Sequence, residues 1–363
     1  MRLRTGICTA VAGIGLCLIG FLTGCQSAPM EADSPGEPVA PDSHAAAVVA
    51  EASAADEDGG PAASQDAVDL VLRFAPDRPV TYKVTAETEA SVRWEGDASS
   101  KPDSFRGGAI GNRVEITYEQ RVDRVSDNGN AVVKVTILAL KYLGRSRETV
   151  VLDFDSVRDQ DRQGPLSELI GRSYEVEMTP KGAVVSVDGV AGIRDSIKGD
   201  SPDHQTALKL IGDKEIRERH EVPALMALED ETVCPGGTWS NVKLFSFGRM
   251  GARAYERLYT LDRIEADDSR IAHVTMKGIP SAAAAAQLHQ GQTDAVPAGL
   301  FDHVDSYQGQ LSLDLEAGAI EAYVEQFRTE WVAVDQEAIQ SGTDRPAAVR
   351  MDRTVSYRLE RIR

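Results

Sequence analysis

Two distant stretches of the chain repeat the same pattern of apolar and charged residues, and this repeat restricts the possible folds more than any other feature. Residues 121–136 align with residues 260–275 without a gap, and Asp123-Arg124 falls opposite Asp262-Arg263. Four apolar positions also correspond, namely Val122, Val125, Val132 and Val135 in the first stretch and Leu261, Ile264, Ile271 and Val274 in the second. Asn128-Gly129 is a strong signal for a tight turn, so each stretch is predicted to be a β-hairpin.

Weaker matches keep the same order in both halves of the chain. Thr81-Tyr82 corresponds to Thr238-Trp239, and the segment Gly182–Val184 corresponds to Gly318–Ile320. Together these matches predict a mainly β (α+β) fold with two related antiparallel β-meanders, at about 69–190 and 232–363. The meanders would form two curved sheets, or one continuous sheet, around a shared core. The alternative is that unrelated hairpins resemble one another by chance.

A helical segment at about 190–228 separates the two predicted meanders. Ser201-Pro202 combines an N-cap residue with proline at the first helical position. Asp213 is a candidate cap for a further helix that ends before Pro223. On either side of this segment apolar and polar residues alternate, as in residues 311–315, and such alternation indicates half-buried strands.

The first 24 residues have the composition of a signal peptide. Arg2 and Arg4 precede an apolar run over residues 7–21 that is too short for a permanent membrane span. The following Leu22-Thr23-Gly24-Cys25 resembles the lipobox read by the bacterial lipoprotein signal peptidase. The resemblance implies cleavage before Cys25, a diacylglycerol on its sulfur, and a fatty acid such as palmitate on the new N-terminus. The alternative is an ordinary secretory signal with a chance cysteine.

The lipid on Cys25 would hold the exported protein on a membrane. Because Gln26 follows the cysteine and no aspartate retention signal is present, we expect the outer membrane of a two-membrane cell, with the protein facing the periplasm or the cell surface. Residues 25–68 then form a disordered acidic tether. Residues 26–68 contain nine Asp or Glu and no Lys or Arg, and about 43 such residues reach roughly 35–40 Å.

The charge of the chain argues against several classes of partner. The formal net charge is −18, which excludes the basic footprint of a nucleic-acid-binding protein. It also argues against docking on anionic lipid heads by charge. The predicted globular part has one cysteine, Cys234, so it has no internal disulfide framework. Cys234 could be a nucleophile, but a nucleophilic thiol needs a base or positive surroundings, and its neighbours are Val233 and Pro235-Gly236-Gly237. A structural role is therefore favoured.

A search for catalytic and metal-binding patterns yields no set of groups with the required spacing. None of the six histidines has zinc-ligand spacing, and no nucleophile elbow, Walker loop or dinucleotide fingerprint is present. Asp302-His303 with Asp305 is the best metal candidate, but a solvated loop is favoured because Asp302 and His303 would point to opposite faces of a strand. We therefore predict no catalytic residues, no metal and no cofactor.

Aromatic residues are the remaining candidates for a binding site. They could line an apolar cavity or fill the core between the sheets, and the core is favoured. The six proposed as ligand-binding are Tyr82, Trp94, Tyr118, Trp239, Tyr255 and Trp331.

Two short motifs give the chain a family resemblance. One runs from Gly171-Arg172-Ser173-Tyr174 to Gly182-Ala183-Val184, and the other is Pro223 followed by the segment Val233–Trp239. The chain resembles, over roughly residues 70–363, an uncharacterised family of bacterial exported lipoproteins defined as a domain of unknown function. The resemblance implies a β-rich fold and supplies no catalytic residues.

These features predict a membrane-anchored lipoprotein that acts as a non-enzymatic binding or structural module of the cell envelope. Its partners would be the membrane, through the lipid on Cys25, and an envelope protein or an apolar ligand, but no nucleic acid. The alternative is a periplasmic carrier of lipid or another apolar ligand in a curved-sheet cavity. An enzyme such as a hydrolase is the third reading, and it would require convergent carboxylates or histidines in a cleft.

Overall fold

The structure, a computed structural model, describes residues 67–362 apart from residues 77, 98, 100, 229–231, 248–251, 267–269, 282–301, 335–339 and 343–345. The predicted signal peptide, Cys25 and nearly all of the predicted tether lie outside the described residues. No helix within the described part is both long and apolar enough to cross a bilayer.

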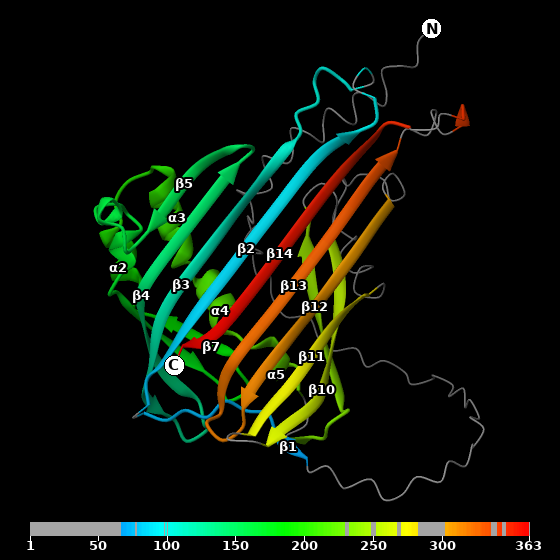
Figure 1. Cartoon of the computed structure of the whole chain (residues 1–363). Coiled ribbons are helices and arrows are strands. Elements are labelled where there is room, and N and C mark those ends of the chain that lie inside the picture. The colour runs from blue at the N-terminus through cyan, green and yellow to red at the C-terminus, as the bar shows by residue number, and fades with distance from the viewer. Residues whose placement is uncertain are drawn as a thin grey trace, which may run out of the picture.

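The fold is mainly β, as predicted, and its strands form one continuous antiparallel sheet of 12 strands rather than two sheets (Figure 1). The strand order is β7-β6-β4-β3-β2-β14-β13-β12-β11-β10-β9, with β5 pairing to β4 beside this path. The first half of the chain supplies β2 (Val80–Glu95), β3 (Gly108–Val125), β4 (Ala131–Ser146), β5 (Thr149–Asp155), β6 (Ser173–Met178) and β7 (Val184–Asp188). The second half supplies β9 (Thr238–Ser246), β10 (Ala252–Ala266), β11 (Arg270–Pro280), β12 (Asp302–Asp314), β13 (Ala319–Val334) and β14 (Ala348–Ile362).

The final strand joins the two halves of the sheet. Strand β14 pairs with β13 on one side and with β2 on the other, so the end of the chain lies next to the beginning of the globular part. A separate two-stranded ribbon pairs β1 (Val68–Asp69) with β8 (Thr232–Val233). Apolar and polar residues alternate over residues 68–74, which predicts a longer strand, but only Val68 and Asp69 pair as a strand.

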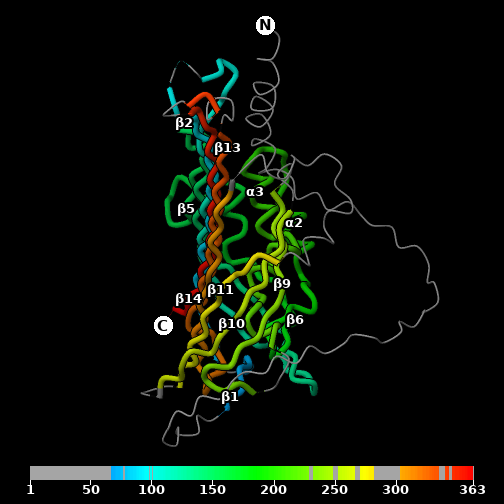
Figure 2. Tube along the Cα trace, turned by 90° about the vertical axis from the view of Figure 1, so that its right-hand side faces the viewer, coloured from blue at the N-terminus to red at the C-terminus, as the bar shows by residue number. Residues whose placement is uncertain are grey.

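The helical segment lies where the sequence predicts it. It comprises α2 (Val190–Ser196), α3 (Pro202–Leu210), α4 (Asp213–His220) and α5 (Pro223–Met226). Figure 2 shows that the sheet curves, so that β6, β9 and the helices lie on the same side of its central strands. The core lies between this concave face and the helices, and it includes Ile211, Ile216 and Leu225, none of which is exposed.

The hairpins that define the sequence repeat share a structural irregularity. The register between β3 and β4 shifts between Val122 and Arg124, and that between β10 and β11 shifts between Leu261 and Arg263. Both shifts are β-bulges at the matched aspartates, Asp123 and Asp262. From one edge of the sheet to the other, β9 to β13 follow one another in the same direction as β2, β3, β4, β6 and β7. These features favour the internal duplication, which stays a prediction.

Aromatic side chains fill the concave side of the second half. Phe245 of β9 stacks on Phe327 of β13 with ring centroids 4.2 Å apart, and Phe247 meets Trp331 edge to face at 5.0 Å. Tyr255 and Tyr307 pack against the same Phe327 ring at 5.2 and 5.6 Å. This part of the concave side is therefore a packed core.

Candidate functional site

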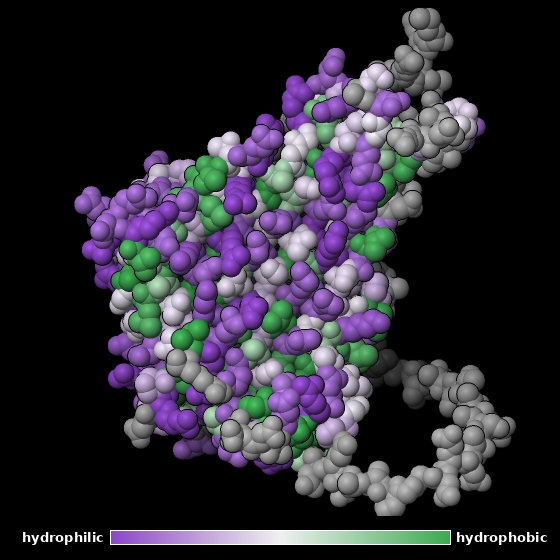
Figure 3. All heavy atoms as spheres, viewed as in Figure 1, coloured by the Kyte–Doolittle hydropathy of each residue, from purple (hydrophilic) through white to green (hydrophobic). Residues whose placement is uncertain are grey.

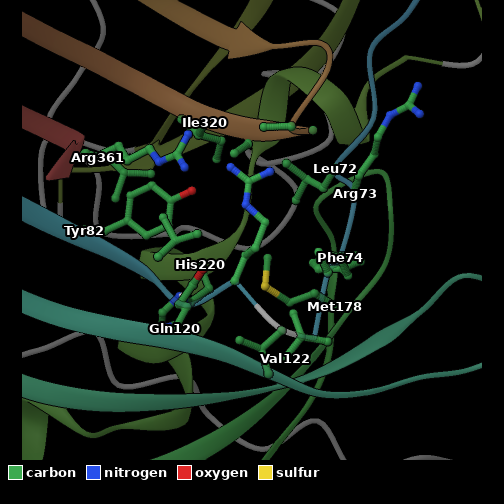
Figure 4. Close-up of a pocket in the computed structure, with 18 of the residues that line it drawn as sticks. Leu72, Arg73, Phe74, Tyr82, Gln120, Val122, Met178, His220, Ile320 and Arg361 are labelled. Carbon is green, nitrogen blue, oxygen red and sulfur yellow. The ribbon is translucent and has the colours of Figure 1, made fainter. Parts of the chain in front are cut away.

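A cavity of about 90 Å³ lies at the end of the sheet where β2 begins and β14 ends (Figure 4). We call it the strap cavity, because residues 70–75 cross this end of the sheet as a strap and form one of its walls. The apolar side chains of its wall are Leu72, Phe74, Val80, Val122, Val133, Met178, Ile320 and Leu359. The polar side chains are Arg73, Arg78, Tyr82, Tyr118, Gln120, Arg219, His220 and Arg361.

Two hydrogen bonds attach the strap to turns in both halves of the sheet. The backbone N–H of Leu72 donates to the Pro180 carbonyl between β6 and β7, at 2.8 Å. The backbone N–H of Arg73 donates to the Gly318 carbonyl between β12 and β13, at 2.9 Å. The side chains of Leu70 and Leu72 are buried below the strap. The strap thus bridges the two turns that the sequence repeat places in corresponding positions.

The charges around the strap cavity have one sign. Four arginines line it, and no Asp or Glu does. Arg361 forms an ion pair at 2.7 Å with Glu321, which stands outside the cavity wall. Figure 4 shows the Tyr82 hydroxyl and the Arg361 guanidinium on the same side of the hollow, whereas the side chain of Arg73 extends away from it.

Buried polar groups of β3, β6 and α4 form a network on the inner side of the cavity. His220 contacts the Gln120 amide through Nδ1 at 3.2 Å and the Tyr174 hydroxyl through Nε2 at 2.8 Å. Arg219 donates from Nη1 to the same Tyr174 hydroxyl at 3.0 Å and from Nη2 to the Leu210 carbonyl at 2.7 Å. Both α4 residues are buried, with 6% of Arg219 and 4% of His220 exposed.

Burial favours the neutral forms of the tyrosines and of His220 around the cavity. It raises the pKa of Tyr82 to about 12, and it raises the pKa values of Tyr118 and Tyr174 above the usual tyrosine value. Burial, followed by the charge of Arg219, lowers the pKa of His220 well below its usual value. His220 is therefore a neutral hydrogen-bonding group at neutral pH.

Acidification is expected to destabilise the fold through His220. Below about pH 6.5 the unfolded chain takes up a proton at this histidine and the folded chain does not, because the pKa is lowered in the folded state. The unfolded state then binds more protons, so the free energy of unfolding falls by about 1.4 kcal/mol for each unit of decreasing pH. Urea unfolding between about pH 6.5 and 5 measures this slope.

A pair of variants isolates the contribution of His220 to that slope. His220→Gln should reduce the dependence of the free energy of unfolding on pH by the contribution of one titrating group, since glutamine does not titrate. His303→Gln, at an exposed histidine of β12, should keep the wild-type slope. Equal slopes in the two variants would exclude His220 as the cause.

The structure brings together two of the six aromatic candidates. Tyr82 and Tyr118 line the strap cavity with ring centroids 5.9 Å apart. Trp94 packs on Phe105, and Trp239 stacks on Tyr259 while its Nε1 donates to the Ala224 carbonyl. The other two, Tyr255 and Trp331, belong to the aromatic core of the second half. A ligand-binding role for the six stays a prediction, and for these last four the geometry favours packing.

The sequence does not mark the arginines, Gln120 or His220 as site residues. They come from the strap, the turn between the strap and β2, β3, α4 and β14, and no local motif links these segments. Each half of the chain shows at most two of these residues close together, as in Arg219-His220. In the sequence, nothing distinguishes these four arginines from the other Lys and Arg residues of the acidic chain.

The metal candidate on β12 is engaged in other contacts. The Asp305 carboxylate accepts hydrogen bonds from Arg253 at 3.0 Å and from the hydroxyls of Tyr255 and Thr329. His303 Nε2 lies 3.8 Å from the same carboxylate. Across the described residues, no group of three His, Cys, Asp or Glu could hold a metal ion. Cys234 is exposed and is a free thiol.

A second hollow, of about 410 Å³, is lined in part by Glu87, Glu89 and Ser91 of β2. These positions alternate with Val84 and Val92, which are buried on the concave face, so this hollow opens on the convex face. Figure 3 shows that the convex face is largely hydrophilic. The hollow therefore differs from an enclosed apolar carrier site.

The fold and the strap cavity define a β-rich protein with one large curved sheet and a small, partly open hollow beside the strap. Residues 128–320 match the model of a family described as "Family of unknown function (DUF6263)", and the chain belongs to this family. The expected resemblance is therefore confirmed as a domain of unknown function.

Two further comparisons relate the chain to curated proteins and to solved structures. No curated protein matches it. A solved structure described as "Lipid-protein interactions in lipovitellin" is 9% identical with a TM-score of 0.37, and the alignment covers 80% of this chain and 26% of that one. The chain thus spans about a quarter of the length of that structure.

Proposed function

We propose that this protein is a lipid-anchored, non-enzymatic binding module of a bacterial cell envelope, and that the strap cavity is its ligand site. The observation that carries the proposal is the composition of that cavity. One part of its wall is apolar, and the other presents tyrosine, glutamine, histidine and arginine groups. Concave sites with apolar walls and a few converging polar groups are typical of small-molecule binding.

The same geometry supports binding over catalysis. Among the groups that line the cavity, His220 is the one whose usual pKa lies near neutrality, and both of its ring nitrogens already have partners. A general base must reach a proton of the substrate, and a buried ring with both nitrogens occupied does not offer that. The wall also lacks a carboxylate that could take this role.

The proposed anchor rests on the sequence around Cys25. Replacing Cys25 with serine is expected to move the protein from the membrane fraction to the soluble fraction and to abolish labelling by an alkyne analogue of palmitate. The lipid of the wild-type protein would hold it on the membrane, since each buried CH₂ contributes roughly 0.8 kcal/mol. Replacing Cys234, the exposed thiol of the globular part, is the matched control. Unchanged labelling of Cys25→Ser would contradict the anchor.

The apolar wall favours a second candidate, a binder of one end of an amphiphilic ligand. A volume of about 90 Å³ is below the 150 Å³ or so of a cavity that holds benzene, and far below typical ligand pockets. A whole lipid therefore does not fit, whereas a single ligand group does. For this second candidate function, the remainder of the amphiphilic ligand would extend out of the cavity beside the strap.

Occupation of the strap cavity can be tested by filling it. Ala319 lines the cavity at the start of β13, and Ala319→Leu would add a side chain there. Ala322→Leu, on the same strand but away from the cavity, is the control. Native mass spectrometry of the protein purified from its host should show a bound small molecule in the wild type and in Ala322→Leu, but not in Ala319→Leu. Equal ligand content in all three would place the ligand elsewhere.

A further inference from the structure

We infer that the strap cavity recognises its ligand through a compact oxyanion, a carboxylate or a phosphate group. This inference rests on the proposed function and specifies the chemistry of the same site. It concerns the group that enters the cavity, which can belong to a free anion or to the head of an amphiphile.

The charge of the cavity wall contrasts with that of the whole chain. The chain has 57 Asp and Glu against 39 Lys and Arg. The wall has no acidic residue, and two of its four arginines, Arg219 and Arg361, are buried or half-buried there, whereas Arg73 and Arg78 are exposed. His220 adds no charge at neutral pH, because its pKa is lowered. A hollow lined by one sign of charge within a low-dielectric wall concentrates ions of the opposite sign.

Arg219 carries a buried charge beside the cavity. Its described hydrogen-bond partners are the Tyr174 hydroxyl and the Leu210 carbonyl, both neutral, and within the described residues no carboxylate forms an ion pair with it. Arginine is almost never fully buried unless it is paired, since burial of an unpaired charge is costly. An anion in the adjoining cavity would provide the missing opposite charge.

The donors and the available space also suit an oxyanion. Figure 4 shows the Tyr82 hydroxyl and the Arg361 guanidinium directed toward the hollow from neighbouring strands. Guanidinium groups pair with carboxylate and phosphate in a planar, two-pronged geometry. A cavity of about 90 Å³ is smaller than the 150 Å³ or so of one that holds benzene, so it suits one carboxylate or phosphate group and little more.

The apolar part of the wall indicates which chemical group of the ligand adjoins the oxyanion. Leu72 and Phe74 of the strap stand on the side of the hollow opposite Tyr82 and Arg361 (Figure 4). An alkyl chain attached to the oxyanion would contact these residues. The geometry therefore favours an amphiphile with an anionic head over a free ion, although both carry the same recognised group.

The test compares ligands of matched size with and without the charge. The full-length lipidated protein is purified in a neutral detergent, and binding is followed by calorimetry and by the shift of the melting temperature. The probes are inorganic phosphate, sodium laurate and uncharged dodecanol, each against sodium chloride at the same ionic strength. We expect laurate to bind at least tenfold more tightly than dodecanol, and phosphate to raise the melting temperature.

A pair of arginines on one strand supplies the matched variants. Arg361 lines the cavity and pairs with Glu321 at 2.7 Å, whereas Arg358 is exposed and pairs with Glu360 at 2.6 Å. Arg361→Gln should weaken laurate binding at least tenfold, and Arg358→Gln should leave it unchanged. Arg219→Met is a second test variant in case Arg361→Gln folds poorly. It should also abolish the rise in melting temperature caused by phosphate.

The possible outcomes separate this inference from the proposed function. If dodecanol binds as tightly as laurate, and Ala319→Leu abolishes both, the binding site stands and the oxyanion inference is wrong. If laurate binds equally well to Arg361→Gln, Arg219→Met and the wild type, the recognised group lies elsewhere and the inference is also wrong. If no probe binds and the host-purified protein carries no ligand, the proposed function itself fails.

Discussion

Glu325→Gln is expected to lower the free energy of unfolding by about 3–5 kcal/mol, because it removes the anionic partner of the buried Arg257 and of the half-buried Lys243. Glu325 lies on the concave face of β13 and is 7% exposed. One carboxylate oxygen accepts from Lys243 Nζ at 2.7 Å and from the Tyr307 hydroxyl. The other accepts from the Tyr323 hydroxyl at 2.6 Å and lies 3.7 Å from the guanidinium of Arg257.

The charged state of Glu325 follows from the balance of its surroundings. Burial acts to raise the pKa of this carboxyl, but the charge of Lys243 and the hydrogen bonds from Lys243, Tyr307 and Tyr323 outweigh burial and lower the pKa. Glutamine retains the shape of the side chain but replaces one acceptor oxygen with a donor. In the variant, Arg257 remains buried without an anion, and either Tyr307 or Tyr323 faces another donor.

Urea unfolding of the wild type and of Glu325→Gln at neutral pH measures the loss in free energy of unfolding. Glu168→Gln is the control, because Glu168 also pairs with an arginine, Arg172, but both side chains are about half exposed. Exposed ion pairs contribute little, so this variant should stay within about 0.5 kcal/mol of the wild type. A loss below about 1 kcal/mol in Glu325→Gln would show that the cluster is hydrated or rearranges around the glutamine.

Sequence patterns predicted the strands and the helical segment because those depend on local periodicity. The hairpins at 121–136 and 260–275 are present in the structure, down to a bulge at each matched aspartate. The Ser201-Pro202 signal correctly marks the start of α3. The predicted cap of α4 is wrong by one residue, because Gly212 is the N-cap and Asp213 is the first helical residue. In these places the local sequence and the tertiary structure favour the same conformation.

The candidate site could not be predicted in the same way, because it depends on how the sheet curves. Arg361 is at the end of β14 and the strap precedes β2, and the pairing of β14 with β2 brings these two ends of the globular part together. An alternating pattern also predicts a full strand for residues 68–74, yet pairing stops at Asp69. Beyond it the backbone bonds to two turns instead, while Leu70 and Leu72 still point into the core.

Gly318→Ala is expected to displace the strap and to lower the free energy of unfolding by about 2–5 kcal/mol. Gly318 has a φ of 58°, in the left-handed region, where a side chain costs roughly 1–2 kcal/mol. A Cβ at this position would also overlap the backbone nitrogen, Cβ and Cγ of Arg73. Overpacking of this kind adds about 1–3 kcal/mol to the destabilisation. It should also weaken the hydrogen bond that the Arg73 N–H donates to the Gly318 carbonyl.

A second glycine separates the conformational cost from the steric one. Gly171 has a φ of 76°, and a Cβ added there would meet no atom within 4 Å. Gly171→Ala should therefore lose only the conformational part, about 1–2 kcal/mol by urea unfolding. Trypsin should cut after Arg73 faster in Gly318→Ala than in Gly171→Ala, because a displaced strap exposes that bond. If both variants lose the same stability and are cut at the same rate, the contact between Gly318 and Arg73 does not hold the strap, and the wall of the cavity must be fixed by the buried side chains of Leu70 and Leu72 alone.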